Sequence, residues 1–176
     1  MDDLLAKAKG IKLLVLDVDG VLTDGLLYYT ENGSESKSFS VRDGLGMKLA
    51  QAAGVELAII TGRHSMALVR RAGEMGINML LQGVKYKSQM LGQLLERKGL
   101  SWEQVAYMGD DINDLACLTQ VGLPMAPLDA ASEVLATATF IASRPGGHGA
   151  VREACELIVK AKGLWEKLGG SYFTEQ

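Results

Sequence analysis

Acidic residues stand at two points of the chain where an apolar run has just ended. Asp17 and Asp19 follow the run 11–16, and a denser acidic cluster occupies 110–114 after a second apolar run. Neighbouring carboxylates repel one another and resist burial, so they are stable together when a divalent cation or a shared proton neutralises them. These residues therefore predict a site of metal-assisted or acid–base chemistry.

Groups that can bind anions follow two other apolar runs. Thr61 and Arg63 come after the run 56–60, and Lys87 comes after the run 78–81. A hydroxyl and an ammonium group can donate to phosphate oxygens, while carboxylates suit Mg²⁺, which often completes its coordination with a substrate phosphate. Together these groups predict phosphoryl transfer, a reaction that depends on positioning and on charge stabilisation.

Each of these residues also has a plain structural interpretation. Thr61 or Asp110 alone could cap a helix, and Lys87 alone could be a surface lysine, with Lys85 as its competitor. The pattern Asp-x-Asp-Gly at 17–20 also occurs in calcium-binding loops, but the glutamate that closes such a loop is missing here. Only the joint pattern favours the catalytic interpretation.

The apolar runs before these groups have the length of buried strands. We predict strands at 12–16, 56–60, 78–81, 104–108, 123–126 and 139–141. Helical periodicity predicts helices at 46–53, 65–75, 87–98, 113–120, 130–136 and 149–168. This alternation indicates an α/β fold with a parallel sheet and helices on both faces, in which ligands bind beyond the carboxyl ends of the strands. We expect a single domain over residues 1–176.

Residues 26–41 interrupt this alternation directly after the first strand. Two stretches, 26–30 and 35–41, flank Asn32-Gly33, a pair that is typical of β-hairpin turns. Because an isolated two-stranded ribbon is barely stable in water, two interpretations are open. The hairpin is either an exposed flap or an association surface, whose apolar side chains pack on a partner subunit.

Composition limits the partners of the protein. The chain has 176 residues, of which 48% are hydrophobic and 22% charged, and its net charge is −3. This balance does not attract nucleic acid or an acidic membrane surface, and no apolar run approaches the roughly 20 residues that span a bilayer. Cys117 and Cys155 are too few for a disulfide framework, and no secretion signal is visible at the start. We expect a cytoplasmic protein with a small-molecule substrate and with neither nucleic acid nor membrane as a partner.

Four motifs occur in an order that resembles the haloacid dehalogenase superfamily of phosphohydrolases: Asp17-Val18-Asp19-Gly20, Ile60-Thr61-Gly62-Arg63, Lys87, and Gly109-Asp110-Asp111 with Asp114. The resemblance implies a Rossmann-like fold and an aspartyl-phosphate intermediate. Asp17 would be the nucleophile, and Asp19 would protonate the leaving alcohol and then deprotonate the attacking water. Thr61 and Lys87 would bind the transferring phosphoryl group.

The same resemblance implies a Mg²⁺ cofactor. The ion would be held by the carboxylates of Asp17 and Asp110 and by the backbone carbonyl of Asp19. Asp111 and Asp114 would lie behind these ligands and orient Lys87 or the waters of the metal.

Most members of the superfamily insert a cap domain over the site. Here residues 20–61 have room only for the hairpin and one helix, and residues 63–87 for about one helix and one strand. The chain therefore resembles the subclass without a cap domain, which often completes its site by oligomerising. The resemblance thus implies an oligomer, and in its more specific form, given next, a homotetramer that forms through the hairpin.

Segments 17–24, 40–44, 61–63 and 146–153 resemble, more specifically, the 3-deoxy-D-manno-octulosonate 8-phosphate phosphatases, which serve lipopolysaccharide synthesis. The resemblance implies that the substrate is an acidic sugar phosphate. It also implies a sugar pocket formed by Ser40, Val41, Arg42, Asp43 and Gly44, by the cations Lys48, Arg63 and Arg71, and by Asp19 and Lys87.

Several alternatives stay open at this point. Position 48 is Lys and position 148 is His where the octulosonate enzymes often carry Arg, so a nonulosonate 9-phosphate remains an alternative substrate. A catalytically idle oligomerisation domain and a receiver domain are further alternatives. The glycines at 146–149 either start the last helix or form the root of a flexible tail, 170–176, that approaches a neighbouring site.

Overall fold

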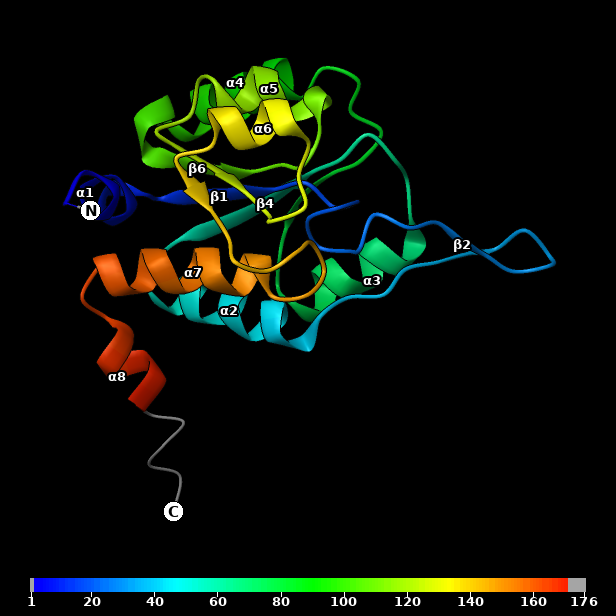
Figure 1. Cartoon of the computed structure of the whole chain (residues 1–176), viewed down its shortest axis with the longest axis horizontal. Helices are drawn as coiled ribbons and strands as arrows, with labels where there is room; N and C mark the ends of the chain where they lie inside the picture. The colour runs from blue at the N-terminus through cyan, green and yellow to red at the C-terminus, as the bar shows by residue number, and fades with distance from the viewer. Residues whose placement is uncertain (1, 171–176) are drawn as a thin grey trace.

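Both faces of the central strands are buried, as their uninterrupted apolar sequences predict. The computed structural model describes residues 2–170. In β1 (Leu13–Leu16), Leu13 and Val15 contact the apolar cluster on one side of the sheet, and Leu14 and Leu16 contact the cluster on the other. Two layers of helices therefore enclose the sheet (Figure 1).

The sheet has six parallel strands in the order β5-β4-β1-β6-β7-β8. They are β1, β4 (Glu56–Ile60), β5 (Met79–Leu81), β6 (Val105–Met108), β7 (Leu123–Ala126) and β8 (Phe140–Ile141). All six predicted strands are confirmed, with bounds that differ by at most one residue. Because β1 lies between β4 and β6, the chain reverses its direction of winding next to β1, where α/β sheets open a crevice for a ligand.

One face of the sheet is covered by α1 (Asp2–Gly10), α2 (Val41–Ala52), α3 (Met66–Glu74) and α7 (Ala150–Ala161). The other face is covered by α4 (Lys87–Lys98), α5 (Leu115–Leu118) and α6 (Ser132–Thr137) (Figure 1). The short helices η1 (Trp102–Gln104) and η2 (Ile112–Asp114) precede β6 and α5, and α8 (Trp165–Gly170) follows α7. The predicted α/β class is confirmed.

Two predicted helices have other bounds in the structure, and one helix was not predicted. Helix α2 begins at Val41 and not at 46, because the Ser40 hydroxyl caps it and accepts from the backbone N–H groups of Arg42 and Asp43. The predicted helix 149–168 is divided into α7 and α8, because Gly163 adopts a left-handed conformation (φ +70°) that ends α7. Helix α1 was not predicted, since Ala8 is its one fully buried side chain among those described.

The hairpin predicted after β1 is present and projects from the body of the molecule (Figure 1). Its ladder is short, with β2 (Tyr28–Tyr29) antiparallel to β3 (Glu35–Ser36). The Gly33 N–H donates to the Thr30 carbonyl at 2.9 Å, and Gly33 has a φ of +81°. Asn-Gly thus lies at the turn, as expected, whereas Val41 belongs to α2 and not to the hairpin.

The described residues leave no room for a cap domain. Residues 20–61 contain the hairpin, α2 and β4, and residues 63–87 contain α3, β5 and the start of α4. Among the helices of residues 2–170, none has both the length and the apolar character that crossing a bilayer requires.

Candidate active site

The carboxyl ends of β1, β4 and β6 surround a cavity of about 260 Å³. All four sequence motifs contribute to its lining, which consists of Asp17, Asp19, Gly25, Thr61, Gly62, Arg63, Lys87, Asp110, Asp111 and Asn113. Parallel strands align their carboxyl ends, so residues up to 96 positions apart in the sequence meet at one sheet edge. The structure therefore brings the predicted catalytic residues together.

A chain of buried polar groups begins at Asp17. Its Oδ2 lies 2.7 Å from Lys87 Nζ, which also donates to Asp114 Oδ1 at 2.7 Å. The same Asp114 oxygen accepts from the Tyr107 hydroxyl at 2.6 Å, and Asp114 Oδ2 accepts from the Asp110 N–H at 3.1 Å. Three donors thus hold the fully buried Asp114, which fixes Lys87 beside Asp17.

The electrostatics of the site favour a bound cation. One carboxylate oxygen from each of Asp17, Asp110 and Asp114 lies within 4.8 Å of the others. Burial, and then the charge of Asp114, raises the pKa of Asp17 to about 7. Burial, and then the charges of Asp17 and Asp114, raises the pKa of Asp110 to about 7. Although burial opposes its charge, the pKa of Lys87 is raised by Asp17 and Asp114, so Lys87 stays protonated.

This donor set fits Mg²⁺. Both oxygens of Asp114 are already engaged by donors, whereas Asp17 and Asp110 line the cavity as two oxygen ligands whose charges repel each other. A hard divalent cation would remove that repulsion. Asp111 is exposed and caps η2 through the Ile112 N–H at 2.7 Å, at the rim of the same cavity.

Two glycines allow the loop after β1 to approach Asp110 closely. Gly20 has a φ of +82°, and a Cβ at this position would lie 1.9 Å from Asp110 Oδ2. A Cβ on Gly146 would lie 1.8 Å from the Gly20 carbonyl oxygen. The glycine-rich segment 146–149 thus supports the loop that carries Asp19. Gly149 is also the N-cap of α7, which agrees with the interpretation that these glycines start the last helix. The tail interpretation concerns residues 171–176, which lie outside the described residues.

The hairpin reaches back to this cavity through charged side chains. Lys37 Nζ donates to Asp19 Oδ1 and lies 3.2 Å from Glu35 Oε1. Arg63 donates to Glu35 Oε2, and its Nε lies 3.6 Å from Asp19 Oδ2. We call Asp19, Glu35, Lys37 and Arg63 the hairpin charge cluster. It ties β3 to the loops after β1 and β4.

Most of the predicted sugar-pocket residues lie elsewhere. Val41, Gly44, Lys48 and Arg71 line a second hollow of about 220 Å³ between α2 and α3, and Arg71 donates to the Ser40 carbonyl at 3.1 Å. Arg42 is exposed. Of the residues predicted for the sugar, Asp19, Arg63 and Lys87 line the catalytic cavity.

Asp43, which the resemblance assigns to the sugar pocket, lies where α2 meets α7. Asp43 is 1% exposed, and its Oδ1 accepts from the Arg152 N–H at 2.7 Å, at the start of α7. It therefore joins α2 to α7 as a helix cap. Burial raises the pKa of Asp43, since the hydrogen bonds that it accepts compensate only in part.

The sequence interpretation missed Lys37, Glu35 and Tyr107. Lys37 directly follows β3 and is two residues from Glu35, a spacing that in extended chain puts both side chains on one face. This pattern could have indicated a charged face turned inward. Tyr107 looks like any apolar residue of β6, and nothing in the sequence marks its hydroxyl as a partner of Asp114.

Comparison with known proteins gives a consistent result. Residues 81–152 match the family model of haloacid dehalogenase-like hydrolases. The chain is 44% identical over 168 residues to 3-deoxy-D-manno-octulosonate 8-phosphate phosphatase KdsC of Escherichia coli K12, covering 96% of this chain and 89% of that protein.

Two solved structures extend this likeness to the fold. The phosphatase of the same name from Moraxella catarrhalis, in complex with magnesium, phosphate and KDO, is 40% identical with a TM-score of 0.96, covering 98% of this chain and 99% of that one. The Yersinia pestis enzyme is 43% identical with a TM-score of 0.91, covering 96% and 90%.

Proposed function

Because the chain belongs to the 3-deoxy-D-manno-octulosonate 8-phosphate phosphatase family of haloacid dehalogenase-like hydrolases, we propose that it releases phosphate from that sugar acid phosphate. The observation that carries the proposal is the buried Asp17–Lys87 pair, which faces Asp110 in one cavity with Thr61. A nucleophile, two phosphate-binding groups and a cation-binding carboxylate thus surround a single space.

The residues divide the reaction into two displacements. An oxygen of Asp17 attacks phosphorus, the bond from phosphorus to the sugar oxygen breaks, and Asp19 gives its proton to that oxygen. Water then attacks phosphorus, the bond to Asp17 breaks, and Asp19 takes up the proton of the water. Lys87 and Thr61 donate to the phosphoryl oxygens in both steps, which balances their negative charge.

The carboxylates of Asp17 and Asp110 would hold Mg²⁺, together with the backbone carbonyl of Asp19. When bound, the ion supplies positive charge to the phosphoryl group and to these carboxylates. Asp114 supports the site from behind by holding Lys87, and Asp111 by capping η2 next to Asp110.

Substrate choice rests on cations near the mouth of the cavity. Arg63 lines the cavity and is partly exposed, so it can meet the carboxylate of an acidic sugar. We propose that Lys48 and Arg71, with residues 40–44 around them, contribute to the sugar pocket of the assembled enzyme and not to that of a lone chain. This explains their position in a separate hollow.

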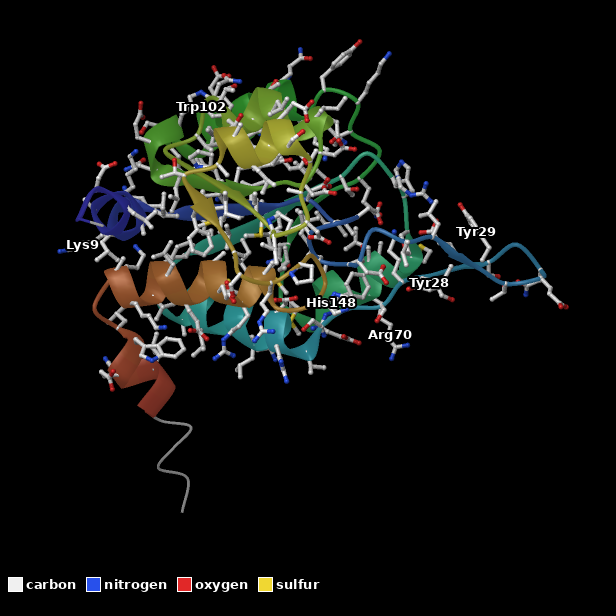
Figure 2. The ribbon with its side chains drawn as sticks, in the orientation of Figure 1. Lys9, Tyr28, Tyr29, Arg70, Trp102 and His148 are labelled. Carbon is white, nitrogen blue, oxygen red and sulfur yellow. The ribbon has the colours of Figure 1, made fainter. Side chains whose placement is uncertain are left out.

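We propose a homotetramer that assembles through the hairpin. Four consecutive apolar side chains there are exposed, namely Leu26 at 60%, Leu27 at 44%, Tyr28 at 44% and Tyr29 at 62%. Tyr28 and Tyr29 lie on the part of the chain that projects beyond the helices (Figure 2). Such a patch is favourable in water only when a partner covers it. A cytoplasmic location also stays a prediction.

Purified protein with Mg²⁺ should release phosphate from 3-deoxy-D-manno-octulosonate 8-phosphate, and Asp17→Asn should abolish this release. A nonulosonate 9-phosphate should give a lower kcat/KM. If the nonulosonate is preferred, the substrate assignment is wrong. If intact oligomers hydrolyse neither acid, the chain is an idle association domain. Light scattering of Tyr29→Ser should show smaller species than the wild-type tetramer.

A further inference from the structure

The side chain of Lys37 is 2% exposed, although it belongs to a hairpin whose other described side chains are mostly exposed. Burying an ammonium group is unfavourable unless anionic partners compensate for the lost water. Lys37 has two such partners, Asp19 and Glu35. The chain therefore places this charge at a specific point, beside a residue with a role in the proposed reaction.

The contacts of Lys37 restrict the Asp19 carboxylate. Asp19 Oδ1 accepts from Lys37, and Asp19 Oδ2 lies 3.6 Å from Arg63 Nε. These two cations come from different segments, namely the residue that follows β3 and the loop after β4. Glu35 contacts both of them, since its Oε1 faces Lys37 and its Oε2 accepts from Arg63. A carboxylate that is held on both oxygens has little freedom to rotate away from the cavity.

We propose that Lys37 is a positioning residue of this phosphatase, which fixes the Asp19 carboxylate against the oxygen of the leaving group. The inference rests on the proposed function, because it assigns Lys37 a task in the proton transfer made by Asp19. Glu35 in turn keeps Lys37 in place and links the hairpin to Arg63. Lys37 does not touch the phosphoryl group, which Lys87 and Thr61 bind.

If Lys37 positions Asp19, its loss should affect two substrates differently, whereas the loss of a purely structural residue would affect both alike. The alkoxide of a sugar is a poor leaving group and needs a proton from Asp19, whereas p-nitrophenolate leaves without one. Misplacing the Asp19 carboxylate should therefore slow hydrolysis of the sugar phosphate far more than hydrolysis of p-nitrophenyl phosphate. General damage to the cavity would slow both substrates alike.

The test compares Lys37→Met with wild type on both substrates, with Lys7→Met as the control. Methionine keeps an unbranched apolar stem and removes the charge. Lys7 is an exposed lysine of α1, and within residues 2–170 its ion pair is with Asp3. We expect kcat on the sugar phosphate to fall by about ten- to a hundred-fold with KM within about threefold. Turnover of p-nitrophenyl phosphate should stay within about threefold, and Lys7→Met should match wild type.

Two further variants keep the test decisive. Lys37→Arg retains the charge and should recover most of the lost kcat even if Lys37→Met folds poorly. Adding Lys37→Met to Asp19→Asn should cause little further loss, because the two residues act as one unit. Equal losses on both substrates, no loss at all, or additive losses would overturn the proposal. A wild-type protein that hydrolyses neither substrate would instead refute the function on which it rests.

Discussion

Removing the metal should make the stability of the protein depend on pH in a way that Mg²⁺ abolishes. Asp17 and Asp110 each have a pKa raised from 3.8 to about 7 by burial and by the charges around them. A carboxyl with a raised pKa contributes stability that is fully present below pH 3.8 and is lost as pH rises to about 7. Without metal, the protein should therefore become less stable between about pH 5 and 7.

The size of this effect follows from the difference between the pKa of 3.8 in the unfolded chain and the pKa of about 7 in the folded protein. For one carboxyl, the free energy of unfolding falls by about 4 kcal/mol as pH rises from the lower to the higher value. The two contributions do not simply add, because the pKa of Asp110 already contains the charge of Asp17. Mg²⁺ has to displace the protons of these carboxyls, so its affinity should fall about tenfold per pH unit below 7 for each proton displaced.

The assay is thermal unfolding at pH 5.5, 6.5, 7.5 and 8.5, with EDTA or with a titration of Mg²⁺. The melting temperature with EDTA should fall up to about pH 7, and the gain from Mg²⁺ should rise over the same interval. Asp110→Asn provides the matched control, since it removes one of the repelling charges. Its metal-free form should be more stable than wild type at pH 7.5 and should gain little from Mg²⁺. A Mg²⁺ affinity that is constant between pH 5.5 and 7.5 would refute the reasoning.

Two further predictions follow from buried hydrogen bonds. Tyr107→Phe removes one of the donors that hold Asp114 and so loosens Lys87, and kcat should fall about tenfold. The free energy of unfolding in urea should fall by about 1–3 kcal/mol, because the buried carboxylate of Asp114 loses a hydrogen bond. An unchanged kcat would show that the Tyr107 hydroxyl does not support the site. Asp43→Ala should lower the free energy of unfolding in urea by about 1–2 kcal/mol, because the first turn of α7 loses its cap. Asp43→Asn keeps an acceptor and should lose much less, and equal losses for both variants would contradict the capping role.

The strands of the sheet and the residues that line the catalytic cavity could be predicted from the sequence for the same physical reason. A buried parallel strand is apolar along its whole length, so the point where the polar residues begin marks its carboxyl end. Asp17, Thr61 and Asp110 each stand directly at or just after such a point. Strand order then follows from the short right-handed connections of α/β folds, which bring these ends together.

The sequence was not sufficient where a side chain acts across elements. No local pattern shows that Asp43 caps α7, because this helix starts more than 100 positions later in the chain. Tyr107 cannot be told from an apolar strand residue until its hydroxyl is placed beside Asp114. These contacts depend on the packing angle of helices and on side-chain rotamers, which local patterns do not determine.

The hairpin could be predicted from a local sequence pattern, whereas its contacts with Asp19 and Arg63 could not. Along β3 and the residues after it, Glu35 and Lys37 turn toward Asp19 and Arg63, whereas Ser36 and Ser38 are exposed. The apolar side chains 26–29 on the other arm are also exposed. The hairpin thus turns charged side chains toward its own catalytic cavity and also carries exposed apolar side chains, which the proposed association would cover. In the proposed tetramer, association that orders the hairpin would also order Lys37 and therefore the carboxylate of Asp19.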